Sequence, residues 1–360
     1  MLVLIVLLLR LLLVLSFNDI SGLLQLSCNV TSQEYNALYA LYNSTNGDNW
    51  SSNCNKNWVF PSDYNQPCNQ QSPWNGITCN SQCQIIELSL PNCNLNGKIP
   101  AELGNMIEMN SFYLCNNTLR GTIPSSLGNM TKMENFLVNN NSLTGIIPTQ
   151  LGNMTGTKQF QLNDNSLTGS IPSELVQMKS LRYLYLQDNH LSGQIPTALM
   201  NMSSLLSIDL SNNQKLIGNL NDFFISTRSL QSRSLKFQSI VLSNLSLEGS
   251  LPDGLFGLQS VTQIVLSSNC FTGTLPNIAC FTPKLSTLIL DGLHSQKSST
   301  CKSNSKQKFH GTLPSCLFAS PTLLRLHLAG NGLKGPLPSI STTSVLQYLN
   351  LAGNRLTGIK

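Results

Sequence analysis

The chain has 360 residues, of which 41% are apolar and only 10% are charged, and its formal net charge is +5. This low charge content argues against a cytosolic enzyme and suits one long apolar core. No run of Lys and Arg is dense enough to follow a phosphate backbone, so nucleic acid is not an expected partner.

Residues 1–22 predict a signal peptide. The apolar run from Leu2 to Leu15 is interrupted only by Arg10. A membrane-spanning helix needs about 20 apolar residues and disfavours a central Arg, so we expect cleavage near Ser21-Gly22. The alternative is an uncleaved anchor, because no basic segment precedes the apolar run. Contact with a membrane is expected only through this segment or through an anchor that the sequence does not contain.

Residues 23–84 predict an N-terminal cap. Thr31-x-x-Glu34 forms a capping box, and apolar residues from Tyr35 to Tyr42 follow at helical spacing. The segment that comes next holds Trp50, Trp58, Trp74, Cys54, Cys68, Cys79 and Cys83. Its aromatic rings are expected to seal the open end of the following repeats, which would otherwise expose leucines and an unpaired strand edge.

Residues 85–360 repeat the pattern L-x-x-L-x-L-x-x-N-x-L-x-G-x-I-P with a period of 24 residues, in eleven copies of which the last is cut at Lys360. The alternation in L-x-L predicts a short strand with one buried and one exposed face, so stacked copies form a parallel sheet on the concave side. The Asn amide is expected to bind the backbone of adjacent coils. The predicted fold is therefore an α/β solenoid, in which each coil buries the leucines of its neighbours.

Four copies depart from the pattern. The first, seventh and ninth carry Cys93, Leu245 and Leu293 at the Asn position, which predicts breaks in the amide ladder. The sixth has an extra residue within 213–216, and the ninth has a polar insertion at 294–308. Cys301 lies inside this insertion and Cys316 just after it, so we expect a disulfide between them that tethers the loop. Such loops often carry binding residues.

The final copy ends at Gly358-Ile359-Lys360. We expect it to lack an end cap and to leave its core exposed, which predicts that the chain is a fragment of a longer protein.

Two features predict export to an oxidising compartment. The N-x-[ST] pattern for N-glycosylation occurs at Asn29, Asn43, Asn49, Asn116, Asn129, Asn140, Asn153, Asn201 and Asn244. The eleven cysteines form short-range groups, with Cys54, Cys68, Cys79, Cys83, Cys301 and Cys316 as disulfide candidates. Because their number is odd, one thiol must stay unpaired or pair outside the chain.

The run Trp74-Asn75-Gly76-Ile77-Thr78-Cys79, followed by repeats with Leu-x-Gly-x-Ile-Pro and Leu-Gly-Asn-Met, resembles the ectodomains of plant-type leucine-rich-repeat receptors and receptor-like proteins. It is also similar to the secreted polygalacturonase-inhibiting proteins. The resemblance implies a right-handed superhelix with a ligand-binding concave sheet, and a disulfide between Cys68 and Cys79. The sequence contains no kinase domain, so the kinase role of many such receptors is not carried over.

No catalytic or metal-binding constellation is expected, and the predicted function is not enzymatic and needs no cofactor. Gly330-x-Gly332-x-x-Gly335 matches a dinucleotide fingerprint, but it is in register with the repeat and no long helix follows. A metal site at Cys79-x-x-x-Cys83 is less expected than disulfides, because no His is near in sequence. The strand carboxylates are scattered over different copies, at Glu87, Glu134, Asp164, Asp188, Asp209 and Asp291.

The exposed strand positions are where function is expected, because they are free of packing duty. An aromatic and amide patch and an apolar stripe together comprise Gln159, Gln161, Tyr183, Tyr185, Gln187, Asp188, Asp209, Val241, Val265 and Ile289. They predict an extracellular recognition module that binds a protein, peptide or glycan ligand. The alternatives are a secreted inhibitor of extracellular hydrolases and a structural or adhesive surface protein. Strand propensity alone also favours exposed Tyr and Val.

Overall fold

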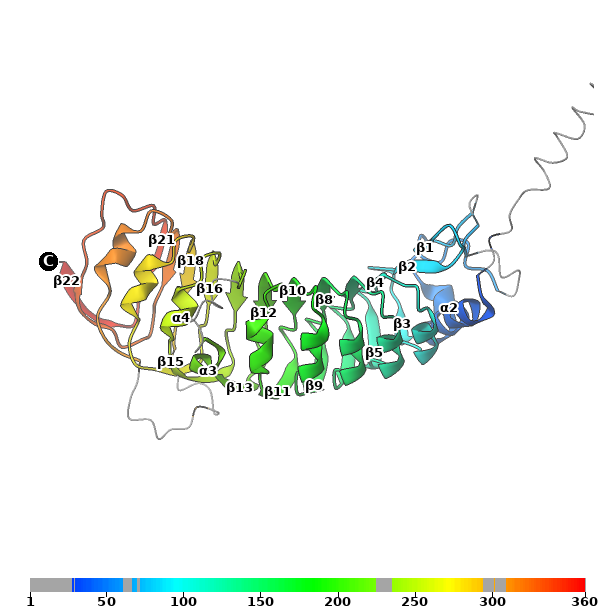
Figure 1. The fold of residues 1–360 in the computed structure, drawn as a ribbon, viewed down its shortest axis with the longest axis horizontal. Coiled ribbons are helices and arrows are strands. Elements are labelled where there is room, and N and C mark those ends of the chain that lie inside the picture. Colours follow the sequence, from blue (N-terminus) through cyan, green and yellow to red (C-terminus); the bar gives the residue numbers. More distant parts are fainter. Residues whose placement is uncertain are drawn as a thin grey trace, which may run out of the picture.

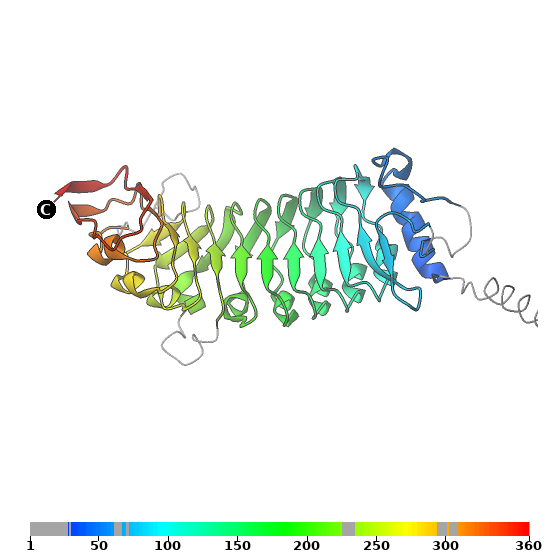
Figure 2. The ribbon, with the colours of Figure 1, turned by 90° about the horizontal axis from the view of Figure 1, so that it is seen from above.

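The computed structural model describes residues 28, 30–60, 67–69, 72–224, 235–293, 301 and 309–359. The predicted α/β solenoid is confirmed, with two parallel sheets that run along its length (Figures 1 and 2). The predicted signal peptide, Asn29 and, apart from Cys301, the insertion at 294–308 lie outside the described residues. No helix in the described part of the chain is long and apolar enough to cross a membrane.

The first sheet lines the concave side of the solenoid (Figure 1). Its spatial order is β1 (Ile77–Cys79), β2 (Ile85–Ser89), β4 (Ser111–Tyr113), β6 (Asn135–Leu137), β8 (Gln159–Gln161), β10 (Tyr183–Tyr185), β12 (Ser207–Asp209), β14 (Ser239–Val241), β16 (Gln263–Val265), β18 (Thr287–Ile289), β19 (Arg325–His327) and β21 (Tyr348–Asn350). Strand β1, from the cap, pairs antiparallel to β2, and the strands that follow are parallel. The cap thereby covers the first edge of the sheet.

The central residue of each concave strand from β4 to β19 points into the core, as the L-x-L alternation predicts. Phe112, Phe136 and Phe160 are fully buried, and their rings stack with centroids 5.3 and 5.5 Å apart. Leu184 continues this column, whereas the corresponding Leu349 of β21 is 39% exposed. The core is thus a continuous column of side chains that successive coils bury for each other.

The repeat pattern did not predict a second parallel sheet. Each of its strands follows a concave strand along the chain, after the turn that leaves the concave sheet. Its members are β3 (Asn96–Lys98), β5 (Thr118–Thr122), β7 (Ser142–Gly145), β9 (Ser166–Gly169), β11 (His190–Gln194), β13 (Lys215–Asn219), β15 (Ser246–Ser250) and β17 (Cys270–Thr272). A separate pair joins β20 (Lys334–Leu337) to β22 (Arg355–Ile359). The bend glycine Gly145 has φ +78°, and a Cβ there would lie 2.8 Å from Cγ2 of Thr122, so this bend requires glycine.

Short helices form the outer side of the coils. They are η2 (Ala101–Asn105), η3 (Ser125–Asn129), η4 (Thr149–Asn153), η5 (Ser173–Gln177), η6 (Thr197–Asn201), α3 (Leu220–Phe224), α4 (Asp253–Phe256), η9 (Asn277–Phe281) and η10 (Ser315–Ala319). The glycine of Leu-Gly-Asn-Met permits close contact between coils, because a Cβ on Gly128 would lie 2.2 Å from the carbonyl oxygen of Gln150.

The repeated Asn binds the backbone of two coils at once. Asn189 donates from Nδ2 to the carbonyls of Leu162 (3.0 Å) and Leu186 (3.1 Å), and its Oδ1 accepts from the N–H of Leu167 (2.9 Å). At Leu293, where the amide is missing, the N–H of Phe271 donates to the Leu293 carbonyl instead (2.8 Å). The ladder therefore satisfies buried backbone groups that no regular strand pairing reaches.

The cap is built on α2 (Ser32–Ser44) and the short helix η1 (Gly47–Asn49). The capping box is confirmed, since Thr31 and Glu34 make both reciprocal hydrogen bonds. The buried Glu34 also accepts from the N–H of Ile85 (2.9 Å), which ties the helix to the first coil. All three tryptophans are at most 4% exposed.

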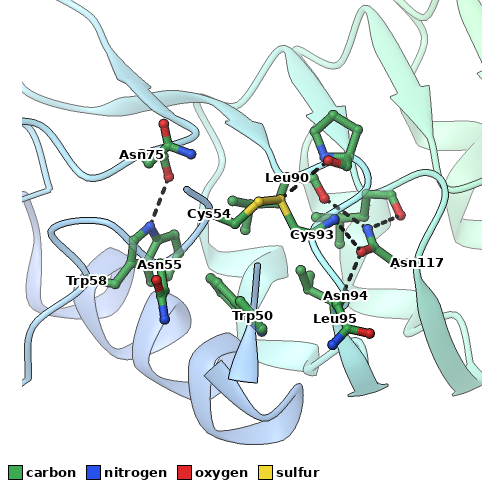
Figure 3. Close-up of a disulfide and its surroundings, with 12 residues drawn as sticks. Trp50, Cys54, Asn55, Trp58, Asn75, Leu90, Cys93, Asn94, Leu95 and Asn117 are labelled. Atoms are coloured by element: carbon green, nitrogen blue, oxygen red, sulfur yellow. Dashed lines mark hydrogen bonds between the residues drawn. A yellow bond between two sulfur atoms is a disulfide. The ribbon is translucent and has the colours of Figure 1, made fainter. Parts of the chain in front are cut away.

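Five disulfides link the described cysteines, and Cys115 is free. Cys68 pairs with Cys79, as the resemblance implied, and Cys28 pairs with Cys83. Cys54 pairs with Cys93, which stands where later coils carry the ladder Asn (Figure 3). Asn117 of the next coil accepts from the N–H of Leu95 (3.0 Å), which is the regular ladder bond, and also from the N–H of Cys93 (3.0 Å).

The expected pairing of Cys301 with Cys316 is wrong. Cys301 pairs with Cys270 of β17, and Cys316 pairs with Cys280 of η9. Both partners belong to the preceding coil, so these disulfides link adjacent coils instead of closing the insertion on its own coil.

Candidate functional site

Six of the ten predicted surface residues form one continuous row across the concave sheet, and Gln187 and Asp188 follow the end of β10. Pairing of β8 through β18 places Gln161 beside Tyr185, Tyr185 beside Asp209, and then Val241, Val265 and Ile289 in turn. Neighbouring strands lie about 4.8 Å apart, so adjacent side chains of this row are in contact distance. Each of these side chains is half-buried. We call this set the concave row, and we include in it Gln159 and Tyr183, which lie two residues earlier on their strands.

Two tyrosines form the aromatic part of the concave row. The rings of Tyr183 and Tyr185 have centroids 6.3 Å apart and are tilted by 51°. Gln159 and Gln161 lie opposite them on β8. Gln187, which follows β10, has a buried Oε1 with no hydrogen-bond partner among the described residues. The patch thus offers the tyrosine rings and the amides of Gln159 and Gln161 to a polar ligand.

Three carboxylates gather at the C-terminal ends of the central strands. Burial raises the pKa of Asp209, and the nearby charges of Asp188 and Asp164 raise it further, against the lowering effect of hydrogen bonds from Ser211. Asn212 donates to Asp188 (2.7 Å) and Asn163 donates to Asp164 (2.6 Å). None of the three makes a salt bridge within the described ranges, so negative charge accumulates beside the tyrosines.

A pocket of about 510 Å³ opens beside Asp188, where the chain leaves β10 and β12. Sequence analysis did not predict it. Its lining includes His190, Asn212, Lys215 and Asn244 in addition to Asp188. Gln214 and Lys215 belong to the segment of the sixth copy that contains the extra residue. This extra residue was the only feature of the sequence that pointed to the pocket. The pocket extends the candidate surface from the concave row toward the second sheet.

The described sequon asparagines are exposed at residues 43, 49, 116, 129, 140, 153 and 201, and Asn244 is half-buried. Asn116 and Asn140 stand in a column of left-handed residues next to the concave sheet, where Asn140 donates to Asn116 (2.7 Å). Glycans on Asn116 and Asn140 would flank β4 and β6, whereas Asn244, in the same column (φ 54°), would carry a glycan just after β14.

Both cysteines of the Cys79-x-x-x-Cys83 motif are in disulfides, so neither offers a thiolate to a metal. The glycine motif at 330–335 runs from a turn into β20 and precedes no helix within the described coil. In the described part of the chain, no group of three or more His, Cys, Asp or Glu side chains is placed to hold a metal ion.

Family models described as "Leucine rich repeat" match residues 131–191, and residues 84–106 and 109–130. Receptor-like protein 31 of Arabidopsis thaliana is 31% identical over 133 residues, which is 36% of this chain and 11% of that protein. The chain thus spans only a small part of this curated relative.

Two solved structures show the same architecture. The plant peptide hormone receptor RGFR1 in complex with RGF2 is 31% identical with a TM-score of 0.64, and the match covers 76% of this chain and 41% of that one. A plant ice-binding protein has a TM-score of 0.69 at 23% identity, with 92% of this chain and 99% of that one covered. At this identity, the second likeness concerns the fold alone.

Proposed function

We propose that this chain, which is similar to plant leucine-rich-repeat receptors and receptor-like proteins, is the ligand-recognition part of an extracellular receptor-like protein. Its ligand is an extended peptide that lies across the concave row. The single observation that carries this proposal is the in-register series from β8 to β18, which reads Gln161, Tyr185, Asp209, Val241, Val265 and Ile289.

The chemistry of the row defines the peptide. Asp164, Asp188 and Asp209 favour a cationic side chain, because their charge is not neutralised by a salt bridge from the described residues. Val241, Val265 and Ile289 favour apolar side chains on one side of that cation. Tyr183 and Tyr185 supply rigid aromatic surface on the other side.

The size of the row fits a short peptide. From Tyr185 on β10 to Ile289 on β18 there are four strand spacings, or about 19 Å. An extended peptide covers this distance with about six residues. The relative that carries a peptide hormone, RGFR1, is a peptide-binding solenoid of the same architecture, which supports a peptide as the ligand class.

Residues 1–22 act as the export signal in this proposal, residues 23–84 as the cap and residues 85–360 as the repeat array, with the insertion at 294–308. The protein is then exposed outside the cell, where its disulfides are stable. Attachment to a membrane needs an anchor other than the described helices.

The test is selection of a random displayed peptide library on the secreted full chain. We expect enriched peptides to combine Lys or Arg with an apolar residue, and to bind more weakly at high salt. Tyr183→Ala with Tyr185→Ala, and separately Asp188→Asn with Asp209→Asn, should weaken their binding by about tenfold or more. Glu248→Gln is the matched control, since Glu248 is an exposed acid on β15 of the second sheet.

Failure to enrich any peptide, or enrichment that the two double variants leave unchanged, would contradict the proposal. A structural surface protein predicts no effect of either variant. An inhibitor predicts instead that the chain lowers the activity of secreted polygalacturonases, and that the same variants relieve this inhibition.

A further inference from the structure

The cap carries an aromatic surface that the solenoid core does not use. A pocket of about 620 Å³ lies between α2 and the segment Trp58 to Phe60. Tyr39 is 46% exposed and Val59 is 57% exposed on its rim. Large apolar groups this exposed in an otherwise sealed cap indicate a surface that something covers.

The rings of this surface are held in place. The Phe60 ring packs against Tyr39 with centroids 4.9 Å apart and against Tyr42 with centroids 5.2 Å apart. The Tyr42 hydroxyl donates to Oδ1 of Asp48 (2.7 Å), so a carboxylate also lies at the pocket. Burial and Asp48 raise the pKa of Tyr42 to about 12, so this phenol remains a donor well into the alkaline range.

Asn43 lines the same pocket and begins the sequon Asn43-Ser44-Thr45. It lies four residues after Tyr39 on α2, and side chains at this spacing are neighbours on one face of a helix. The Asn43 side chain is exposed, so a sugar attached to its Nδ2 emerges directly beside the Tyr39 ring.

The backbone around Asn43 is firmly anchored. Thr45 is fully buried, its hydroxyl donates to the Leu41 carbonyl (2.6 Å), and its own carbonyl accepts from Nε1 of Trp50 (3.1 Å). A glycan on this helix end therefore has a fixed starting point, unlike one on a long loop, and loses less freedom when it rests on the cap.

We propose that an N-linked glycan on Asn43 folds back onto the cap, with its first N-acetylglucosamine residues on the surface formed by Tyr39, Val59 and Phe60. The apolar C–H face of the sugar matches the negative face of an aromatic ring. Asn36 and Asp48, which also line the pocket, supply polar partners for its hydroxyl and acetamido groups. The glycan then forms the outer layer of the cap.

The experiment compares Asn43 with Asn153, an exposed sequon residue at the end of η4 on the outer side of the coils. The secreted full chain is digested under native conditions with peptide N-glycosidase, and release at each site is followed by mass spectrometry. We expect Asn43 to lose its glycan about tenfold more slowly than Asn153, the factor that one or two aromatic contacts supply.

Tyr39→Ala should bring release at Asn43 to the rate at Asn153, and should leave Asn153 unaffected. Val59→Ser is a second variant of the same surface whose side chain is already largely exposed, so it tests the contact without risk to the core.

An unmodified Asn43 in a chain that is glycosylated at Asn153 overturns the inference and leaves export intact, whereas no glycan at either site overturns both. Equal release rates at the two sites also overturn it. In that case concentration-dependent dimerisation of Asn43→Gln would identify a second copy as what covers the aromatic surface.

Discussion

The coils from β4 to β10, here the early coils, and those from β12 to β19, the late coils, form the same concave sheet but support it differently. Strands of the early coils begin 24 residues apart, whereas β14 starts 32 residues after β12 and β19 starts 38 residues after β18. Their register in the sheet is nevertheless unbroken. Backbone pairing thus sets the concave surface, and extra residues are absorbed elsewhere in the coil.

The early coils rely on close backbone approach and on the amide ladder, with Gly128 against Gln150 and Asn189 between two coils as examples. The late coils lack the amide at Leu245 and Leu293 and contain two disulfides that link adjacent coils. The same concave sheet can therefore be stabilised either by contacts repeated in every coil or by contacts specific to one coil, such as a disulfide.

The largest effect is expected from placing a late-coil feature in an early coil. Asn189→Leu copies the natural Leu293, but no rearranged backbone is available to take over its bonds. We expect a loss of about 3 kcal/mol, because several buried backbone groups lose their partner. Urea unfolding, with hydrogen exchange of the Leu167 amide, measures it. Asn105→Leu at the exposed end of η2 is the control, with a change below about 0.5 kcal/mol.

An intermediate effect should separate the two kinds of coil contact. Gly128→Ala brings a Cβ to 2.2 Å from the Gln150 carbonyl and should cost about 2 kcal/mol. Gly257 of a late coil has φ −79° and its nearest neighbour would be 3.5 Å away, so Gly257→Ala should be neutral or stabilising. Similar urea midpoints for Gly128→Ala and Gly257→Ala would show that the early and late coils do not differ in how closely their backbones approach.

The smallest effect concerns Asp209, which lies where the early and late coils meet. Its pKa is raised in the folded chain, so unfolding releases protons and stability falls as pH rises through that pKa. Asp209→Asn should therefore be more stable than the original chain at neutral pH, and this gain should shrink as the pH falls toward 4, near the usual pKa of Asp. Thermal unfolding over pH measures it, and a gain that does not vary with pH would refute the assignment.

Asp209→Asn should at the same time weaken binding of the selected basic peptides. If Asp209 serves binding, its replacement should make the chain more stable but a weaker binder. The reason is that burying the Asp209 carboxylate costs stability, and this cost is kept because the charge contributes to ligand binding. If both properties were unchanged, Asp209 would be an ordinary surface residue.

The sequence alone determined the solenoid, the concave row and its order. Its period places Gln161, Tyr185 and Asp209 at equivalent positions, and equivalent positions of stacked strands must become neighbours. The capping box at Thr31 was equally local, since both of its bonds lie within four residues. Features that depend on neighbours in sequence, or on the repeat itself, were therefore accessible to prediction.

Only the tertiary structure decided which unlike positions meet. The second sheet, the pairing of Cys301 with Cys270, and the approach of Asp209 to Asp164 and Asp188 join residues from different coils at different pattern positions. Their proximity depends on how tightly adjacent coils approach and on the angle at which each chain leaves its strand. The spacing between coils and this angle are set by packing of the whole stack. No short segment of the repeated sequence encodes them.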